Sequence, residues 1–194
     1  AGIESSMVSP VWLQKGNEMD KILVVSSHAK TTYENTVAEA VNNQTQEKVP
    51  YRLQTPVTVV GEKTERATPE PIPNFELQND FNFLIVSQMG PRKNLENSIR
   101  WWVEEFIDQD VGLVLKINLK NNSIIDYKHT NENIQQILSK YPNRKCKVYL
   151  LHGDLKSSQM TWLYQNPKIN SLINISHGEG FGLPMFEAAR EALP

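Results

Sequence analysis

Residues 81–106 read FNFLIVSQMGPRKNLENSIRWWVEEF, and this stretch decides the fold of the chain. Its first seven residues, Phe81–Ser87, form a short apolar run that predicts a strand. From Asn94 to Ile107, apolar residues recur at Leu95, Ile99, Trp102, Val103 and Phe106, which predicts a helix with one buried face. A buried strand followed directly by a helix is the repeating unit of an α/β protein.

The same alternation continues to the end of the chain. Further strands are predicted at 111–119, 146–151 and 171–175, and further helices at 131–141, 157–165 and 183–192. Four strand–helix units in succession predict a Rossmann-like α/β domain with a doubly wound parallel sheet and right-handed crossovers. Ligands bind outside the carboxyl ends of the strands in such sheets, so every strand-to-helix loop is a candidate site.

The residues before this domain divide into two parts. A helix is predicted to begin at Pro10 with Ser9 as its cap, strands are predicted at 21–26 and 55–60, and a second helix from about Thr31 to Val41. Residues 61–79 contain three prolines and an excess of acidic residues, which predicts a linker or an exposed connection. The expected organisation is therefore a βαβ-like segment at 1–60, a linker at 61–79 and the main domain at 80–194.

Composition excludes several classes of protein. The 194 residues carry a formal charge of -2, and no run of basic residues offers a local patch, so we expect no nucleic-acid partner. No apolar run approaches the roughly 20 residues that span a bilayer, and the N-terminus lacks the features of a signal peptide, so we expect a cytoplasmic protein with no integral membrane segment. The single cysteine, Cys146, can form no internal disulfide, which fits a reducing compartment.

The loop SHGEGFGLP, residues 176–184, has the composition of an anion site. Glycines at 178, 180 and 182 let the backbone turn sharply and bring its N–H groups close to a ligand. Pro184 lies in the first turn of the predicted helix, whose positive end would point toward the same place. Glu179 and Glu187 can accept hydrogen bonds from sugar or ribose hydroxyls.

Two other interpretations of this loop remain open. It can be a tight glycine turn whose acidic residues complement the helix dipole, with Phe181, Leu183, Met185 and Phe186 as core residues. We expect Met185 and Phe186 to be core residues on either interpretation. It can also belong to a nicotinamide-dependent oxidoreductase, although the GxGxxG pattern of dinucleotide-binding proteins follows the first strand and has a different spacing. The histidines have no spacing typical of a metal site, so we expect neither a metal nor a cofactor.

EGFGLPMFE, residues 179–187, resembles the E-x7-E signature of retaining glycosyltransferases with the GT-B fold, especially family 4 (glycosyl transferases group 1). The resemblance extends from about Phe81 to the end of the chain. It implies that Glu179 approaches the transferred sugar and that the amides of Gly180 through Leu183 hold sugar and phosphate oxygens. It also implies that Glu187 binds the ribose hydroxyls.

The resemblance assigns roles in two further loops. Lys93, in SQMGPRKN, matches a lysine that stabilises the leaving diphosphate, but Ser87-Gln88 replace the usual Gly-Arg, so one expected cation is absent unless Arg92 compensates. His152 and Gly153, in HGDLKSS, are expected beside the nucleotide base, although a turn with Ser157 or Ser158 capping the next helix explains that loop equally well.

These expectations define a donor-binding set in which Glu179 and Lys93 are catalytic. The set is Gln88, Arg92, Lys93, His152, Gly153, Gly178, Glu179, Gly180, Phe181, Gly182, Leu183 and Glu187. The expected function is transfer of a sugar from a nucleotide diphosphate sugar to an unidentified carbohydrate, lipid or protein acceptor. A nucleotide-binding module without catalysis is the alternative.

The stretch DKILVVSSHAK, residues 20–30, resembles a part of the N-terminal domain of the same family. We therefore expect 1–60 to be the end of that domain and 80–194 to be a donor-binding domain that is incomplete at its C-terminus. On this interpretation the chain is a fragment of a two-domain GT-B enzyme.

Overall fold

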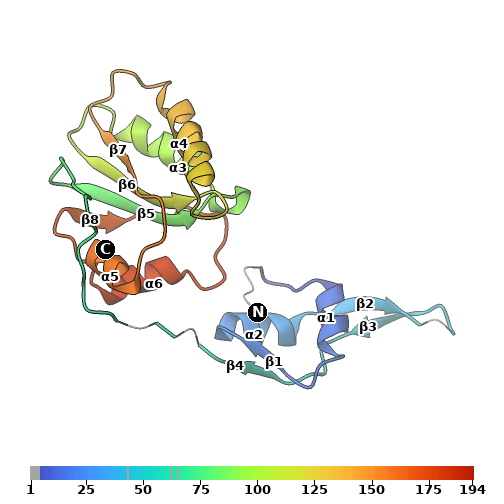
Figure 1. Cartoon of the computed structure of the whole chain (residues 1–194). Helices are drawn as coiled ribbons and strands as arrows, with labels where there is room; N and C mark the ends of the chain where they lie inside the picture. The colour runs from blue at the N-terminus through green and yellow to red at the C-terminus, as the bar shows by residue number, and fades with distance from the viewer. Residues whose placement is uncertain (1–4, 43, 62, 65) are drawn as a thin grey trace. The chain divides into compact units, whose positions relative to one another are not determined.

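The computed structural model describes residues 5–42, 44–61, 63–64 and 66–194. They form two compact units. The first comprises the residues up to Lys63 together with Glu179–Phe181, and the second comprises Thr64–Gly178 and Gly182–Pro194 (Figure 1). None of the helices in these described ranges combines the length and the apolar character that a membrane crossing requires.

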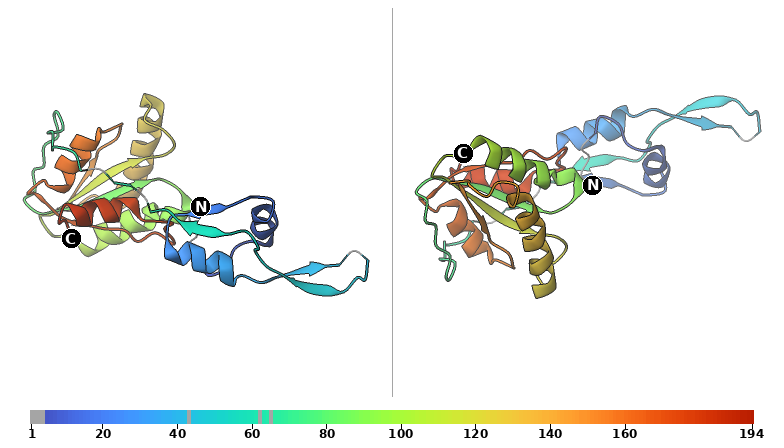
Figure 2. Two further views of the ribbon diagram at one scale, coloured as in Figure 1. Left: turned by 90° about the horizontal axis from the view of Figure 1, so that it is seen from below. Right: turned by 90° about the horizontal axis from the view of Figure 1, so that it is seen from above.

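The first unit is small. Its elements are α1 (Pro10–Gly16), β1 (Ile22–Val24), α2 (Ser27–Asn35), β2 (Ala38–Val41), β3 (Lys48–Tyr51) and β4 (Val57–Val59). Strand β1 pairs in parallel with β4, as a βαβ-like unit requires, and β2 pairs antiparallel with β3 in a hairpin between α2 and β4. The hairpin extends away from the rest of its unit in all three views (Figures 1 and 2).

The predicted bounds of the second helix, Thr31 to Val41, were wrong at both ends. It begins at Ser27, where the Ser26 side chain accepts a hydrogen bond from the Ala29 amide, and it ends at Asn35. Thr36 is extended, and its hydroxyl accepts a hydrogen bond from the Val8 amide at 3.1 Å. The residues that follow pair as β2 with β3, and such pairing between distant residues overrides a local helical pattern.

The second unit contains a four-stranded sheet in which every pairing is parallel, in the order β7-β6-β5-β8. The strands are β5 (Asn82–Gln88), β6 (Gly112–Asn118), β7 (Lys147–Leu150) and β8 (Ile169–Leu172). A short 3-10 helix, η1 (Pro91–Lys93), follows β5, and the α-helices are α3 (Leu95–Glu105), α4 (Ile124–Leu138), α5 (Ser157–Tyr164) and α6 (Leu183–Arg190). The α/β class and the parallel sheet expected from the sequence are confirmed.

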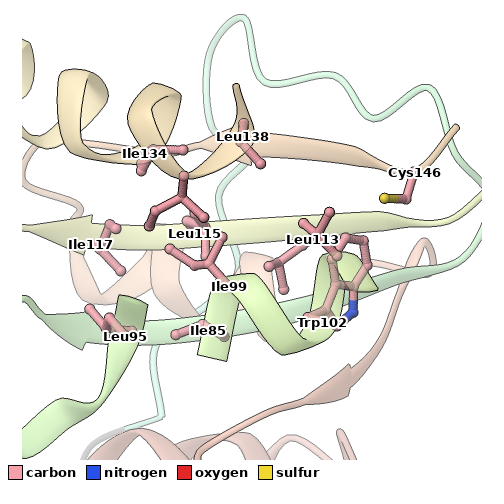
Figure 3. Packing of buried hydrophobic residues seen from close by; sticks show 12 residues of the cluster. Ile85, Leu95, Ile99, Trp102, Leu113, Leu115, Ile117, Ile134, Leu138 and Cys146 are labelled. Atoms are coloured by element: carbon pink, nitrogen blue, oxygen red, sulfur yellow. The ribbon is translucent and has the colours of Figure 1, made fainter. Parts of the chain in front are cut away.

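Helices cover both faces of this sheet (Figures 1 and 2). On one face, residues of α3 and α4 pack on Ile85, Leu113, Leu115 and Ile117, as Figure 3 shows for Ile99 and neighbouring side chains. On the other face, residues of α5 and α6 pack on Leu84 of β5 and Val114 of β6. Alternate residues of one strand therefore enter different cores, which is the pattern of a doubly wound sheet.

Two elements of the second unit differ in extent from the prediction. Helix α4 begins at Ile124, seven residues before the predicted start, because Ser123 caps it by accepting a hydrogen bond from the Asp126 amide at 3.1 Å. Strand β8 covers Ile169–Leu172 rather than 171–175, so more of the chain belongs to the loop before α6.

Part of the stretch predicted as a linker packs on the second unit. Ile72 and Leu77 are buried in the cluster beneath α5 and α6. The Glu70 amide donates to the Ser158 carbonyl at 3.1 Å, and Arg66 Nε donates to Glu191 at 3.1 Å. These contacts fix much of residues 66–79 along the second unit.

Candidate functional site

The strand order places a switch point between β5 and β8. The chain passes from β5 through β6 to β7 at one edge and then returns to place β8 on the other side of β5. The helix after β5, α3, covers one face of the sheet, whereas the helix after β8, α6, covers the other. Ligands of open α/β sheets bind at such a point, so the loops after β5 and β8 flank the candidate site.

Hydrogen bonds tie these two loops together. The His177 amide donates to the Arg92 carbonyl at 2.9 Å, and Nη1 of Arg92 donates to the Gly178 carbonyl. Nδ2 of Asn94 donates to the Ile175 carbonyl at 3.2 Å. Arg92, predicted to contact the donor, therefore directs its guanidinium to the neighbouring loop.

A cavity of about 440 Å³ opens at the carboxyl ends of β5, β6 and β7. It is lined by Val86, Ser87, Gln88, Lys93, Lys116, Asn118, Asp154, Leu155, Met160 and Pro184. Its volume lies within the range of small-molecule sites. The structure thus brings Gln88 and Lys93, two residues of the predicted set, to one cavity beside the first turn of α6.

Lys116 lines the same cavity, and the sequence analysis missed it. It lies within β6 opposite Val86, and its Nζ donates to the Gly153 carbonyl at 2.7 Å. Burial lowers the pKa of Lys116, and the charge of Asp154 opposes that shift. A lysine within the mainly apolar run of β6 was the feature of the sequence that could have revealed it.

Gln88 occupies the position at which the resemblance expects an arginine. Its Nε2 lies 3.4 Å from the carbonyls of both Leu119 and Lys120, at the end of β6. The hydroxyl of Ser87 donates to the Gln88 carbonyl at 3.2 Å. This wall of the cavity is therefore polar but uncharged.

The glycine-rich loop leads into α6. Gly182 precedes the helix with a φ of 77°, a left-handed conformation that favours glycine, and its carbonyl accepts a hydrogen bond from the Phe186 amide at 3.0 Å. Gly178, Glu179, Gly180 and Phe181 lie in the irregular segment before it, and Leu183 is the first helical residue.

The prediction that Met185 and Phe186 are core residues was wrong. They are 38% and 48% exposed, respectively. The buried side of α6 instead carries Ala188, and Glu187 is half-buried. The first turn of α6 thus presents apolar side chains at the surface, although the sequence pattern placed them inside.

Glu187 is held by a buried tyrosine. The hydroxyl of Tyr164, a residue only 2% exposed, donates to Oε2 of Glu187 at 3.1 Å. Burial, followed by the charge of Glu187, raises the pKa of Tyr164 far above its usual range, so the hydroxyl stays protonated and continues to donate. Among the described residues, Oε1 of Glu187 accepts no hydrogen bond.

His152 belongs to a buried pair. Its Nε2 lies 2.8 Å from Asp126, and both side chains are 5% exposed. Burial alone would raise the pKa of Asp126, but hydrogen bonds from His152 and from the amides of residues 119–121 outweigh it and hold that pKa well below its usual range. The His152 side chain therefore has a structural partner, and a contact with a nucleotide base would fall to its backbone.

Gly153, the second residue expected beside the base, has a φ of 106°, which favours glycine. Within the described ranges of the chain, no group of three or more His, Cys, Asp and Glu side chains is arranged to hold a metal ion.

No protein-family model and no curated protein sequence matches this chain. Several solved structures, however, are similar to this chain. An apo structure of OtsA aligns with a TM-score of 0.58 and 14% identity, covering 93% of this chain and 45% of that one. The E. coli trehalose-6-phosphate structure bound with UDP-2-fluoro glucose gives 0.58 and 13% over the same shares of both chains.

The pneumococcal O-GlcNAc transferase GtfA, in complex with UDP and GlcNAc, aligns with a TM-score of 0.52 and 13% identity over 95% of this chain and 31% of that one. The chain thus spans less than half the length of the structures that it matches. At these identities the similarity concerns the fold, and it extends over both units. The chain has the fold of the GT-B glycosyltransferases.

Proposed function

We propose that this chain belongs to a retaining glycosyltransferase that takes a sugar from a nucleotide diphosphate sugar and transfers it to a carbohydrate, lipid or protein acceptor. The observation that carries the proposal is the joining of the loops after β5 and β8 at the switch point of a GT-B fold, beside a cavity lined by Lys93. Two of the matched structures contain UDP or a UDP-sugar analogue, which supports a donor of the same class.

The proposed roles follow the chemistry of each group. The donor diphosphate lies near Lys93 and the N-terminus of α6, where a cation and main-chain N–H groups favour an anion. Glu179 positions the sugar. Oε1 of Glu187 accepts hydrogen bonds from the ribose, while Tyr164 fixes the carboxylate through Oε2. Glu179 and Lys93 act at the reacting end of the donor.

In the proposed reaction the bond between the anomeric carbon and the phosphate oxygen breaks, and its electron pair stays on that oxygen. The acceptor hydroxyl bonds to the same face of the anomeric carbon, and its proton passes to the departing phosphate. Lys93 stabilises the negative charge that grows on the leaving nucleoside diphosphate, which lowers the barrier.

The test is a thermal-shift series with UDP, GDP, ADP, UDP-glucose, GDP-mannose and NADH. A ligand at 100 times its dissociation constant stabilises the folded protein by about 2.7 kcal/mol. We expect one nucleoside diphosphate and its sugar to raise the melting temperature. Stabilisation by NADH alone would indicate an oxidoreductase, and binding without sugar transfer or donor hydrolysis would indicate a module without catalysis.

Glutamate variants then divide the site. Glu187→Ala should weaken binding of the bare nucleoside diphosphate because the ribose loses an acceptor, whereas Glu179→Ala should chiefly weaken binding of the intact sugar donor. Glu96→Ala, on the exposed first turn of α3, is the matched control. Equal losses for the bare nucleotide in both site variants, measured by calorimetry, would contradict this division of roles.

A further inference from the structure

Lys116 is an amine on a covered face of the sheet. Val114, two residues earlier in β6, is fully buried beneath α5 and α6, and side chains two apart in a strand point to the same face. Val86, Leu155 and Met160 contribute apolar surface to the cavity that Lys116 lines. A charged group is costly in such surroundings unless polar partners or a ligand compensate it.

The protein compensates this charge only in part. Nζ of Lys116 donates to the Gly153 carbonyl, and the carboxylate of Asp154 lies in the same cavity. Asp154 also accepts a hydrogen bond from Nδ2 of Asn122. An ammonium group has three donors, so the hydrogen bond to Gly153 leaves further N–H groups for an anion in the cavity.

The position of Lys116 complements the charge that is missing at the end of β5. Gln88 is neutral where the resemblance expects an arginine, and Lys116 lines the same cavity from the adjacent strand. Lys93 lines it from η1. Two cations, one from η1 and one from β6, thus line one cavity, an arrangement that suits a diphosphate.

We propose that Lys116 binds the diphosphate of the donor together with Lys93, in place of the arginine absent at Gln88. The inference rests on the proposed function, because it names a residue for the diphosphate of that donor. It makes Lys116 a binding residue that contacts the substrate, and it leaves Gly153 and Asp154 as the groups that orient the amine.

The experiment uses isothermal titration calorimetry on the full chain at fixed pH and ionic strength. The nucleoside diphosphate found to bind (UDP, GDP or ADP) and its nucleoside are titrated into wild type, K116Q, K116R and K140Q. Lys140 is an exposed lysine beyond the end of α4 and serves as the matched control. Circular dichroism and thermal unfolding without ligand monitor the fold, and K116M, which keeps an unbranched apolar stem, replaces K116Q if that variant does not fold.

We expect K116Q to bind the nucleoside diphosphate about 10- to 100-fold more weakly, the usual effect of losing a charge-assisted hydrogen bond. Affinity for the nucleoside should change less than about twofold, since it lacks the phosphates, and K116R and K140Q should remain close to wild type. Adding Q88R to K116Q should restore much of the lost affinity, because that residue lines the same cavity.

Each other result overturns the inference in a recognisable way. Equal weakening of the diphosphate and the nucleoside, without rescue by Q88R, would assign Lys116 to packing around Gly153. Unchanged diphosphate affinity in K116Q would remove Lys116 from the site while leaving the proposed function standing. Failure of wild type to bind any of the three diphosphates would refute the proposed function first and this inference with it.

Discussion

The two units of the chain are built from the same strand–helix alternation but differ in how much core that alternation creates. In the second unit, strands of up to seven residues carry buried side chains to both faces, where two clusters form beneath two pairs of helices. In the first unit, β1 and β4 have three residues each, and the described core is the single cluster around Leu13 and Tyr33. The comparison teaches that strand length and coverage, more than the βαβ order, decide where burial stabilises the chain.

The exposed apolar residues reflect the same contrast. The described part of the first unit exposes Met7, Val11, Trp12, Met19, Leu23, Val37, Val41, Val49, Val59 and Val60. Its hairpin, β2 with β3, packs the partly buried Ala38 and Tyr51 against this cluster. We therefore expect the first unit to be the less stable of the two and the cavity lined by Lys93 and Lys116 to lie on the more stable one.

The largest expected effect is a direct test of this contrast. Leu113→Ala, at a fully buried position of β6 (Figure 3), should lower the free energy of unfolding of the second unit by about 2–5 kcal/mol. Hydrogen-exchange mass spectrometry in a urea series can measure it, because peptides from each unit report separately. Protection of peptides from the first unit should not change.

Leu13→Ala, at an equally buried position of α1, is the reciprocal variant. It should reduce protection in the first unit and leave the second unit unchanged. If either variant unfolds both units in one transition, the units are not energetically separate and the comparison fails.

A smaller loss of stability is expected from a change in the glycine-rich loop before α6. Gly182→Ala forces a residue with a Cβ into a left-handed conformation and places that Cβ near Cε of Met185, so we expect a loss of about 1–3 kcal/mol. Gly90→Ala is the matched control, since Gly90 has an extended backbone and open space around its Cβ position. A loss as large in G90A, measured by urea unfolding, would show that the conformation of Gly182 is not the cause.

The smallest effect concerns the support of the candidate site. Tyr164→Phe removes the buried hydroxyl that donates to Glu187 and should lower the free energy of unfolding of the second unit by about 0.5–1.5 kcal/mol. Tyr141→Phe removes a hydroxyl that donates to Glu104 at the surface, where we expect a change within about 0.5 kcal/mol. Equal changes in both variants would mean that burial does not strengthen the Tyr164–Glu187 contact.

Much of the second unit could be predicted because its pattern is local. The buried positions of α3, such as Ile99 and Val103, follow helical spacing, and the strands are continuous apolar runs. Gly182 was predicted from the need for a sharp turn, and it has a left-handed backbone. These features depend on propensity and periodicity within a few residues.

The residues that could not be predicted depend on partners far along the chain. Residues 38–41 became a strand because they pair with β3, and His152 is buried because Asp126 lies 2.8 Å away across the fold. Lys116 interrupts an apolar run in the sequence, but its place in the cavity depends on strand order and follows from no local pattern. Met185 and Phe186 fit a core pattern, but the packing of α6 leaves them exposed.

The sequence by itself determined the α/β class, most strands and helices of the second unit, and the glycine loop before α6, because each of these follows from local spacing. Only the tertiary structure decided which strand ends meet. The order β7-β6-β5-β8 brings the loops after β5 and β8 to one switch point and places Lys116 beside Gln88 and Lys93. The physical reason is that pairing between strands and packing of helices on them join residues that no local pattern connects.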